Sequence, residues 1–282
     1  MSSMDREEFR RGSLETWQAM APGWERRRAD VEAITAPVRD WLVRELAPQP
    51  GETILELAAG PGDTGFEAAA ALGENGHLIS TDFSSEMVDV ARRRARELDV
   101  RNVEHLVADA EEIPLADASV DGVLCRFGLM LMADPARALA ETRRVVRSRG
   151  RLVLAVWGPA ERNPWISIAG RTFAQLGLAP PPEPGEPGMF VLADHARLSE
   201  LLEGARFEVE RIEDVPVSLE FADVDAYIAG SRQTGGMFAR VWRDASDAER
   251  DAIRAGLDEG FAPFSVDGGY SLPGQAVVAG AS

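Results

Sequence analysis

One stretch constrains the fold of this chain more than any other. An apolar run at 54–57 enters a glycine-rich turn around Gly60 and Gly62, and an alanine-rich segment follows at 66–72. Strand, tight loop and helix in this order are typical of the first unit of a nucleotide-binding α/β domain. Glycines let the backbone turn sharply and lie against a ligand, because a Cβ there would fill the space. The free N–H groups of the following helix favour a ligand that carries a carboxylate or a phosphate.

Two families of ligand fit this loop. Gly60, Gly62 and Gly65 spell G-x-G-x-x-G, the dinucleotide fingerprint, which favours an NAD(P)-dependent oxidoreductase. Glu56 argues against that interpretation, because a carboxylate beside the loop repels a pyrophosphate but suits a ligand with a cationic amine. The spacing Glu56, Ala58, Gly60, Gly62 resembles the E/D-x-G-x-G-x-G motif of class I S-adenosylmethionine-dependent methyltransferases, with Ala58 in place of the first glycine. The resemblance implies that these four residues bind the cofactor.

The second unit of the domain adds a nucleoside signature. Asp82 ends a predicted strand at 77–82, 22 positions after Gly60, where a carboxylate accepts the hydroxyls of a ribose in NAD and S-adenosylmethionine alike. Phe83 and Met87 are apolar residues where the adenine plane would lie, although ordinary core packing explains them equally well. The segment therefore predicts a nucleoside without choosing between the two cofactors.

The third unit separates the candidates. A strand predicted at 103–108 delivers Asp109 and Ala110. In the methyltransferases that this segment resembles, the acid accepts a hydrogen bond from the adenine amino group and the next N–H meets a ring nitrogen. The stretch 125–157 resembles the ubiquinone/menaquinone-biosynthesis branch (methyltransferase type 11), and the resemblance covers about 50–158 well.

Candidates for the substrate side come from several segments. The resemblance implies that N-terminal helices fold over the cofactor, which would bring Trp17 and Trp24 to the substrate. Phe127 and Met130 follow the predicted strand at 122–125 and are assigned to the same side. Arg126, at the end of that strand, is expected where substrate and cofactor meet, as a cofactor contact or a weak catalytic candidate.

Few residues of the sequence are candidates for a general base. His195 begins a predicted helix at 194–202 and is the weak second candidate for a catalytic residue, whereas His77 and His105 are expected to be structural. Cys125 has no partner histidine that would activate it. The catalytic residue is therefore left unknown.

The whole pattern predicts an α/β Rossmann-like class I methyltransferase fold, with a seven-stranded, mostly parallel sheet, helices on both faces and a helical lid. We expect three parts: an N-terminal helical cap over 1–47, the cofactor-binding core over 48–158, and the remaining strands with helical lid insertions over 159–282. Within the cap, residues 1–12 are expected to fray, and two helices are predicted with a break at 21–23. A proline-rich loop is expected at 180–188, an edge strand at 206–221 and a final antiparallel strand at 275–279.

Composition restricts the partners. The formal net charge of −17 argues against nucleic acid, whose binding needs a basic surface. No membrane span or signal peptide is evident, and the single cysteine excludes an internal disulfide, so the cytoplasm is the expected location. No cluster of residues has the spacing of a metal site.

We therefore expect a methyltransferase that uses S-adenosyl-L-methionine and acts on a small-molecule acceptor by in-line transfer, mainly through positioning. The alternatives are an NAD(P)-dependent oxidoreductase and a non-catalytic module that binds S-adenosylmethionine. The identity of the acceptor, the atom that is methylated (O, N or C) and the oligomeric state are left open.

Overall fold

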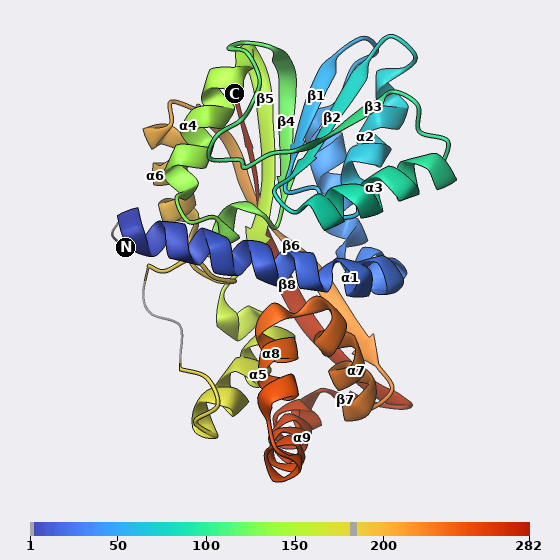
Figure 1. Cartoon of the computed structure of the whole chain (residues 1–282), viewed down its shortest axis with the longest axis vertical. Coiled ribbons are helices and arrows are strands. Elements are labelled where there is room, and N and C mark those ends of the chain that lie inside the picture. The colour runs from blue at the N-terminus through green and yellow to red at the C-terminus, as the bar shows by residue number, and fades with distance from the viewer. Residues whose placement is uncertain (1–2, 181–184) are drawn as a thin grey trace.

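The computed structural model describes residues 3–180 and 185–282, which form an eight-stranded sheet flanked by helices (Figure 1). The strand order is β3-β2-β1-β4-β5-β8-β6, and β7 pairs with β8. The strands are β1 (Thr53–Leu57), β2 (His77–Asp82), β3 (Val103–Val107), β4 (Val120–Arg126), β5 (Val146–Trp157), β6 (Val209–Phe221), β7 (Ser265–Val266) and β8 (Gly269–Ala281). The strands β1 to β5 are parallel, and β8 runs antiparallel to both of its neighbours. The predicted fold class is confirmed, with the short β7 as an eighth strand.

Helices connect and cover the strands. They are α1 (Ser3–Leu46), α2 (Asp63–Leu72), α3 (Ser85–Glu97), α4 (Pro135–Val145), α5 (Pro164–Gln175), α6 (His195–Gly204), α7 (Val224–Thr234), α8 (Gly236–Asp244) and α9 (Asp247–Phe261), with single 3₁₀ turns at Leu129–Leu131, Ala160–Arg162 and Ala262–Phe264. Figure 1 shows α2 and α3 on one side of the sheet and α4 and α6 on the other. No helix within the described ranges is both long and apolar enough to cross a bilayer.

The order of the strands creates one switch point. The chain moves outward from β1 to β3 and then returns to place β4 on the other side of β1. In open α/β sheets, ligands bind outside the carboxyl ends of the strands at such a point. The glycine loop leaves β1 at this position, and Arg126 and Phe127 leave β4 beside it.

Helix α1 crosses this edge of the sheet (Figure 1). It is continuous from Ser3 to Leu46 and contains both Pro22 and Pro37, so the predicted break at 21–23 and the frayed start are wrong for the described residues. A proline inside a helix removes a hydrogen bond and costs about 3 kcal/mol or more. Packing compensates, because Trp17 and Trp24, on either side of Pro22, pack against a buried cluster that includes residues of α3.

Gly23 serves helix packing. A Cβ at this position would lie 2.2 Å from the carbonyl oxygen of Gln233 in α7. The indole N–H of Trp24 donates to the carbonyl of Thr234 at 3.1 Å, and Arg26 Nε donates to the Gln233 side chain at 3.0 Å. A Pro-Gly pair that reads locally as a break therefore marks the close approach of α1 to α7.

The second half of the chain builds a separate helical lobe, formed by α5, α7, α8 and α9 on the far end of the long β6–β8 ribbon (Figure 1). This lobe has its own apolar core, distinct from the main core under the sheet. As predicted, β6 is an edge strand and the helices α7 to α9 separate the last strands; β8, however, begins at Gly269, well before the expected 275. Part of the proline-rich loop, 181–184, lies outside the described residues.

Asn163 joins the two parts of the molecule. Its fully buried side chain donates to the carbonyl oxygens of Gly158, Pro159 and Gln275 at 3.0–3.1 Å, and accepts the Gln275 N–H at 3.0 Å. These bonds hold the end of β5, the start of α5 and the middle of β8 together. The lobe thereby takes a fixed position against the sheet.

Replacing Asn163 by alanine is expected to lower the free energy of unfolding by about 2–4 kcal/mol, because several buried backbone groups lose their partner. Urea denaturation followed by tryptophan fluorescence measures this loss. The control is Asn102→Ala, since that amide serves two carbonyls at a less buried position and should cost about 1 kcal/mol. Equal losses for the two variants would contradict this role of Asn163.

Candidate cofactor and substrate site

The glycine loop turns through three residues with positive φ angles: Ala58 at 50°, Gly60 at 54° and Gly62 at 86°. A Cβ added to Gly60 meets no atom within 4 Å, so open space lies beside the backbone there. A Cβ on Gly62 would lie 2.6 Å from the ring of Phe66, so packing as well as φ requires glycine. Gly62 provides no side-chain cap for α2, and Glu56 accepts the N–H of Gly65, so within the described residues the N–H groups of Asp63 and Thr64 are left free to face an anion.

Ala58 adopts a left-handed conformation that glycine occupies without strain. Its methyl group faces Gly128, where an added Cβ would lie 2.5 Å from that of Ala58. The departure from the glycine of the family motif is thus accommodated by a glycine in the turn after β4. The expected contact between Ala58 and the cofactor stays a prediction.

Glu56 lies beneath the loop. It is 2% exposed, accepts the N–H of Gly65 at 2.9 Å and the hydroxyl of Ser80 at 3.3 Å. Burial raises the pKa of Glu56 to about 8, against the opposing effects of the Gly65 bond and the charge of Arg126. A Cβ on Gly65 would lie 2.1 Å from the Glu56 carboxylate. The third glycine of the apparent dinucleotide fingerprint is therefore explained by Glu56, and no pyrophosphate is needed to account for it.

Asp82 links the loop to the second strand. Its carboxylate accepts the N–H of Gly60 and that of Ser84, each at 2.9 Å. Burial raises the pKa of Asp82 to about 6, although these backbone bonds lower it. Of the two neighbouring apolar candidates, Phe83 is half-buried, whereas Met87 is buried and packs with Ala21 of α1. Met87 is thus part of a small apolar cluster, and its expected contact with adenine stays a prediction.

Asp109 follows β3, and residues of α1 reach it. Arg10 Nε lies 3.4 Å from Asp109 Oδ2, and the same guanidinium pairs with Glu111, which is 2% exposed. Burial raises the pKa of Asp109, opposed by the charges of Arg10 and Arg137. Ala110 is half-buried beside it and packs against the main core. The two strand-end carboxylates, Asp82 and Asp109, thus lie on adjacent strands at the edge that α1 covers.

Arg126 is held by α1. Its guanidinium donates to Glu32 at 2.5 Å and to the hydroxyl of Thr35 at 2.7 Å, and the Arg126 and Glu32 side chains are both 12% exposed. On the other side of the loop, Arg28 pairs with Asp63 at 2.9 Å. In this conformation Arg126 fastens the helix to the end of β4, and its expected contact with the cofactor stays a prediction.

An aromatic wall stands beside Arg126 and consists of Phe127, Trp157 and Trp165. Phe127 has φ 61°, an unusual value for a bulky residue, and such strain concentrates at functional sites. Its ring stacks on Trp157 at 4.0 Å, and Trp157 meets the edge of Trp165 at 5.1 Å. Met130 is 1% exposed and its sulfur accepts the N–H of Trp157, so it lies behind the wall. The structure does not bring Met130 to an open surface.

Trp17 and Trp24 form a second aromatic pair, with ring centroids 5.7 Å apart on α1.

His195 is not near the switch point: it pairs with Asp214 at 2.8 Å on the edge strand β6. Burial raises the pKa of Cys125 to about 11, so its thiol is no nucleophile at neutral pH. Within the described residues, no group of three or more His, Cys, Asp or Glu side chains is placed to hold a metal ion.

Sequence reasoning missed the charged face of α1. Arg6 pairs with Asp134 at 2.6 Å, and Arg10, Arg28 and Glu32 make the contacts described above. Arg6 and Arg10 stand four positions apart, so one helical face presents both, and this spacing was the available signal. A polar N-terminus alone does not reveal that Asp134 and Glu111, the partners of Arg6 and Arg10, lie more than a hundred residues away.

Comparisons with known proteins agree with this geometry. Residues 48–164 match the family model described as a methyltransferase domain. An uncharacterised 37.1 kDa transposon protein of Streptomyces fradiae is 44% identical over 106 residues, which cover 38% of this chain and 30% of that protein. A demethylmenaquinone methyltransferase of Deinococcus radiodurans is 40% identical over 84 residues, covering 29% and 34%. The chain thus spans about a third of the length of these relatives.

Solved structures extend the likeness to the fold. An S-adenosylmethionine-dependent methyltransferase from Aquifex aeolicus superposes with a TM-score of 0.53 at 21% identity, covering 69% of this chain and 92% of that one. At this identity the likeness concerns the fold alone. Together with the family match, it confirms the resemblance that the glycine loop and the strand ends predicted.

The buried carboxylate of Glu56 predicts a pH dependence. Its pKa of about 8 in the folded protein exceeds the ordinary value of 4.5, so the fold holds a proton that the unfolded chain releases. The stability that Glu56 contributes is full below about pH 4.5 and is lost as the pH rises to about 8.

Glu56→Gln removes this titration. The free energy of unfolding of the variant, relative to the wild type, should therefore rise between pH 4.5 and 8, by at most about 4–5 kcal/mol. Urea denaturation across that range measures the difference, with Glu112→Gln, at an exposed glutamate, as the control. A difference that stays constant with pH would contradict the buried, protonated state of Glu56.

Proposed function

We propose that this chain, whose residues 48–164 form a class I S-adenosylmethionine-dependent methyltransferase domain, transfers a methyl group from S-adenosyl-L-methionine to a small-molecule acceptor. One observation carries the proposal. Two half-buried or buried carboxylates, Asp82 and Asp109, end adjacent strands beside a loop whose backbone is open at Gly60. A nucleoside with an amino-acid tail needs these groups in this order along the sheet edge.

The residues present fit the cofactor. The open space at Gly60 and the uncapped first turn of α2 suit the amino-acid part, with its carboxylate toward the free N–H groups. Asp82 would accept the ribose hydroxyls, and Asp109 with the N–H of Ala110 would meet the adenine. Glu56 would act indirectly, because its bond to the Gly65 N–H fixes the position of the start of α2.

Methyl transfer from S-adenosylmethionine requires few catalytic groups from the protein. S-adenosylmethionine supplies an activated methyl group on its sulfonium, so the protein need provide no nucleophile of its own. The chain contributes position and the exclusion of water. Helix α1 serves both, because Arg10 and Glu32 bind it beside the ends of β3 and β4, and Arg28 binds it to the start of α2. In the described residues no histidine lies at these strand ends, which supports catalysis by positioning.

The aromatic side chains support an apolar, planar acceptor. Phe127 and Trp157 stack at the end of β4 and β5, and Trp17 with Trp24 stands on the covering helix. Aromatic faces favour offset stacking on a flat ring. The family model ends at residue 164, before most of the helical lobe, so the acceptor class rests on these side chains.

Turnover tests the proposal against its rivals. Release of S-adenosylhomocysteine is measured with a panel of phenols, quinols and amines, and we expect turnover with at least one flat acceptor. Binding of S-adenosylhomocysteine without turnover on any acceptor would favour a non-catalytic module. Quenching of NADH fluorescence on binding would favour the oxidoreductase.

Asp82→Asn should weaken the binding of S-adenosylhomocysteine by about 1–3 kcal/mol, because the amide is a poorer partner for the ribose hydroxyls. Isothermal titration calorimetry measures the affinity. Asp99→Asn, at an exposed carboxylate paired only with Arg101, is the matched control and should bind as the wild type does. Unchanged affinity in the Asp82 variant would show that its carboxylate serves only the backbone.

Arg10→Ala should speed the association of S-adenosylhomocysteine about three- to tenfold, since the guanidinium now holds the carboxylate intended for adenine and fastens α1 over it. Stopped-flow fluorescence measures this rate. Raising the salt concentration should accelerate the wild type and leave the variant less affected. The control is Arg11→Ala, at the exposed neighbour, and an equal acceleration there would contradict the role of Arg10.

A further inference from the structure

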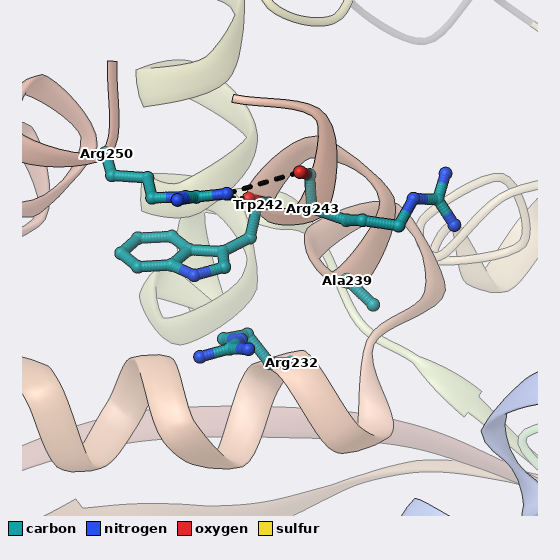
Figure 2. A pocket seen from close by; sticks show the side chains of 5 residues that line it. All are labelled: Arg232, Ala239, Trp242, Arg243 and Arg250. Atoms are coloured by element: carbon teal, nitrogen blue, oxygen red, sulfur yellow. Dashed lines mark hydrogen bonds between the residues drawn. The ribbon is translucent and has the colours of Figure 1, made fainter. Parts of the chain in front are cut away.

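A cavity lies outside the edge that α1 covers. It belongs to the helical lobe, has a volume of about 380 Å³ and is lined by Arg232, Ala239, Trp242, Arg243 and Arg250 (Figure 2). The lining residues come from α7, α8 and α9. The volume lies within the range of small-molecule sites. None of the residues proposed for the cofactor or for the aromatic wall takes part in it.

The buried indole of Trp242 organises the cavity. Arg250 lies flat over one face of the ring and Arg232 lies beneath the other (Figure 2), with guanidinium carbons 6.0 Å and 5.7 Å from the ring centroid. Arg254 approaches the same ring at 5.9 Å. A guanidinium stacked on an aromatic face keeps its N–H groups in its own plane, where they can still donate. Both faces of the indole are therefore covered by guanidinium groups, so a ligand must bind to the N–H groups at the edges of these guanidinium groups.

The arginines differ in how many donors they have left. Arg250 donates to the carbonyl oxygens of Trp242 and Arg243 and to Asp247, and Arg243 pairs with Asp244. Within the described part of the chain, Arg232 makes no hydrogen bond or ion pair. Its guanidinium makes a cation–π contact with the indole of Trp242. A guanidinium carries five N–H donors. None of these donors of Arg232 is engaged within the described residues, so it can donate to a ligand in the cavity.

The charge of the lining is unusual for this protein. The chain as a whole carries a formal charge of −17, yet every charged residue that lines the cavity is an arginine. Carboxylates pair with Arg243, Arg250 and Arg254, so within the described residues Arg232 is the cation of this group that an anion would neutralise. The planar fork of arginine matches the oxygens of phosphate and carboxylate groups.

We propose that this cavity is a binding site for a small, multiply charged oxyanion, with Arg232 as its main contact and Arg243 and Arg250 as its flanking contacts. The ligand would join α7, α8 and α9 at one point. Trp242 would position the site, because its ring holds the guanidinium groups of Arg232 and Arg250 at a fixed separation. The proposal is independent of the methyl transfer, because it uses none of the same residues.

Isothermal titration calorimetry at low ionic strength tests the site with sodium pyrophosphate as the probe. We expect saturable binding of one anion per chain, weakened about tenfold or more by Arg232→Ala. This arginine has no ion pair to lose, so the variant should fold, and circular dichroism checks that it does. A parallel titration with citrate distinguishes a phosphate site, which prefers pyrophosphate, from a carboxylate site.

The matched control is Arg240→Ala, on helix α8, which carries three of the lining residues, but itself outside the lining. It should bind pyrophosphate within about twofold of the wild type, because only general attraction is lost. Arg232→Gln, which keeps a polar side chain without the charge, should behave like the alanine variant. Absence of saturable binding, or an equal loss in the Arg240 variant, would overturn the proposal.

Discussion

The loop at the centre of this fold depends on one buried contact, between the carboxylate of Glu56 and the N–H of Gly65. The contact fixes where α2 begins relative to β1, and it requires glycine at position 65 because any Cβ would overlap the carboxylate. With that start fixed, Gly60 and Gly62 take the positive φ angles that open the loop. Burial of Glu56 opposes its ionisation although the Gly65 bond favours it, so Glu56 contributes most to the free energy of unfolding at low pH, where the group is protonated in both states.

The second constraint is the unequal attachment of α1. Its carboxyl-terminal end is part of the main core through buried residues such as Trp41 and Leu42, and its middle packs on α3 and α7, whereas its first turns rely on ion pairs such as that of Arg10 with Glu111. Apolar burial is insensitive to salt, and partly exposed ion pairs are weakened by it. A helix attached in this way is held least firmly at its amino-terminal end, which suits a cover for a site that must exchange ligands.

Much of this arrangement follows from local sequence. The glycine loop, the strand-end acids Asp82 and Asp109, and the mixed sheet were all predictable, because turn chemistry and apolar runs act over short distances. The continuity of α1 was not, since it depends on contact between Gly23 and a helix two hundred residues later. Arg10 was missed for the same reason, as its partners become neighbours only in the folded chain. The placement of Met130 behind the aromatic wall likewise required the packing of β5.

The most direct test of the account is a crystal structure of the protein with S-adenosylhomocysteine. The account predicts the amino-acid tail beside Gly60 and the uncapped start of α2, the ribose on Asp82 and the adenine at Asp109, with Arg10 displaced from that carboxylate. A ligand bound elsewhere, or an Asp109 that keeps Arg10 while the adenine lies outside the strand ends, would contradict it.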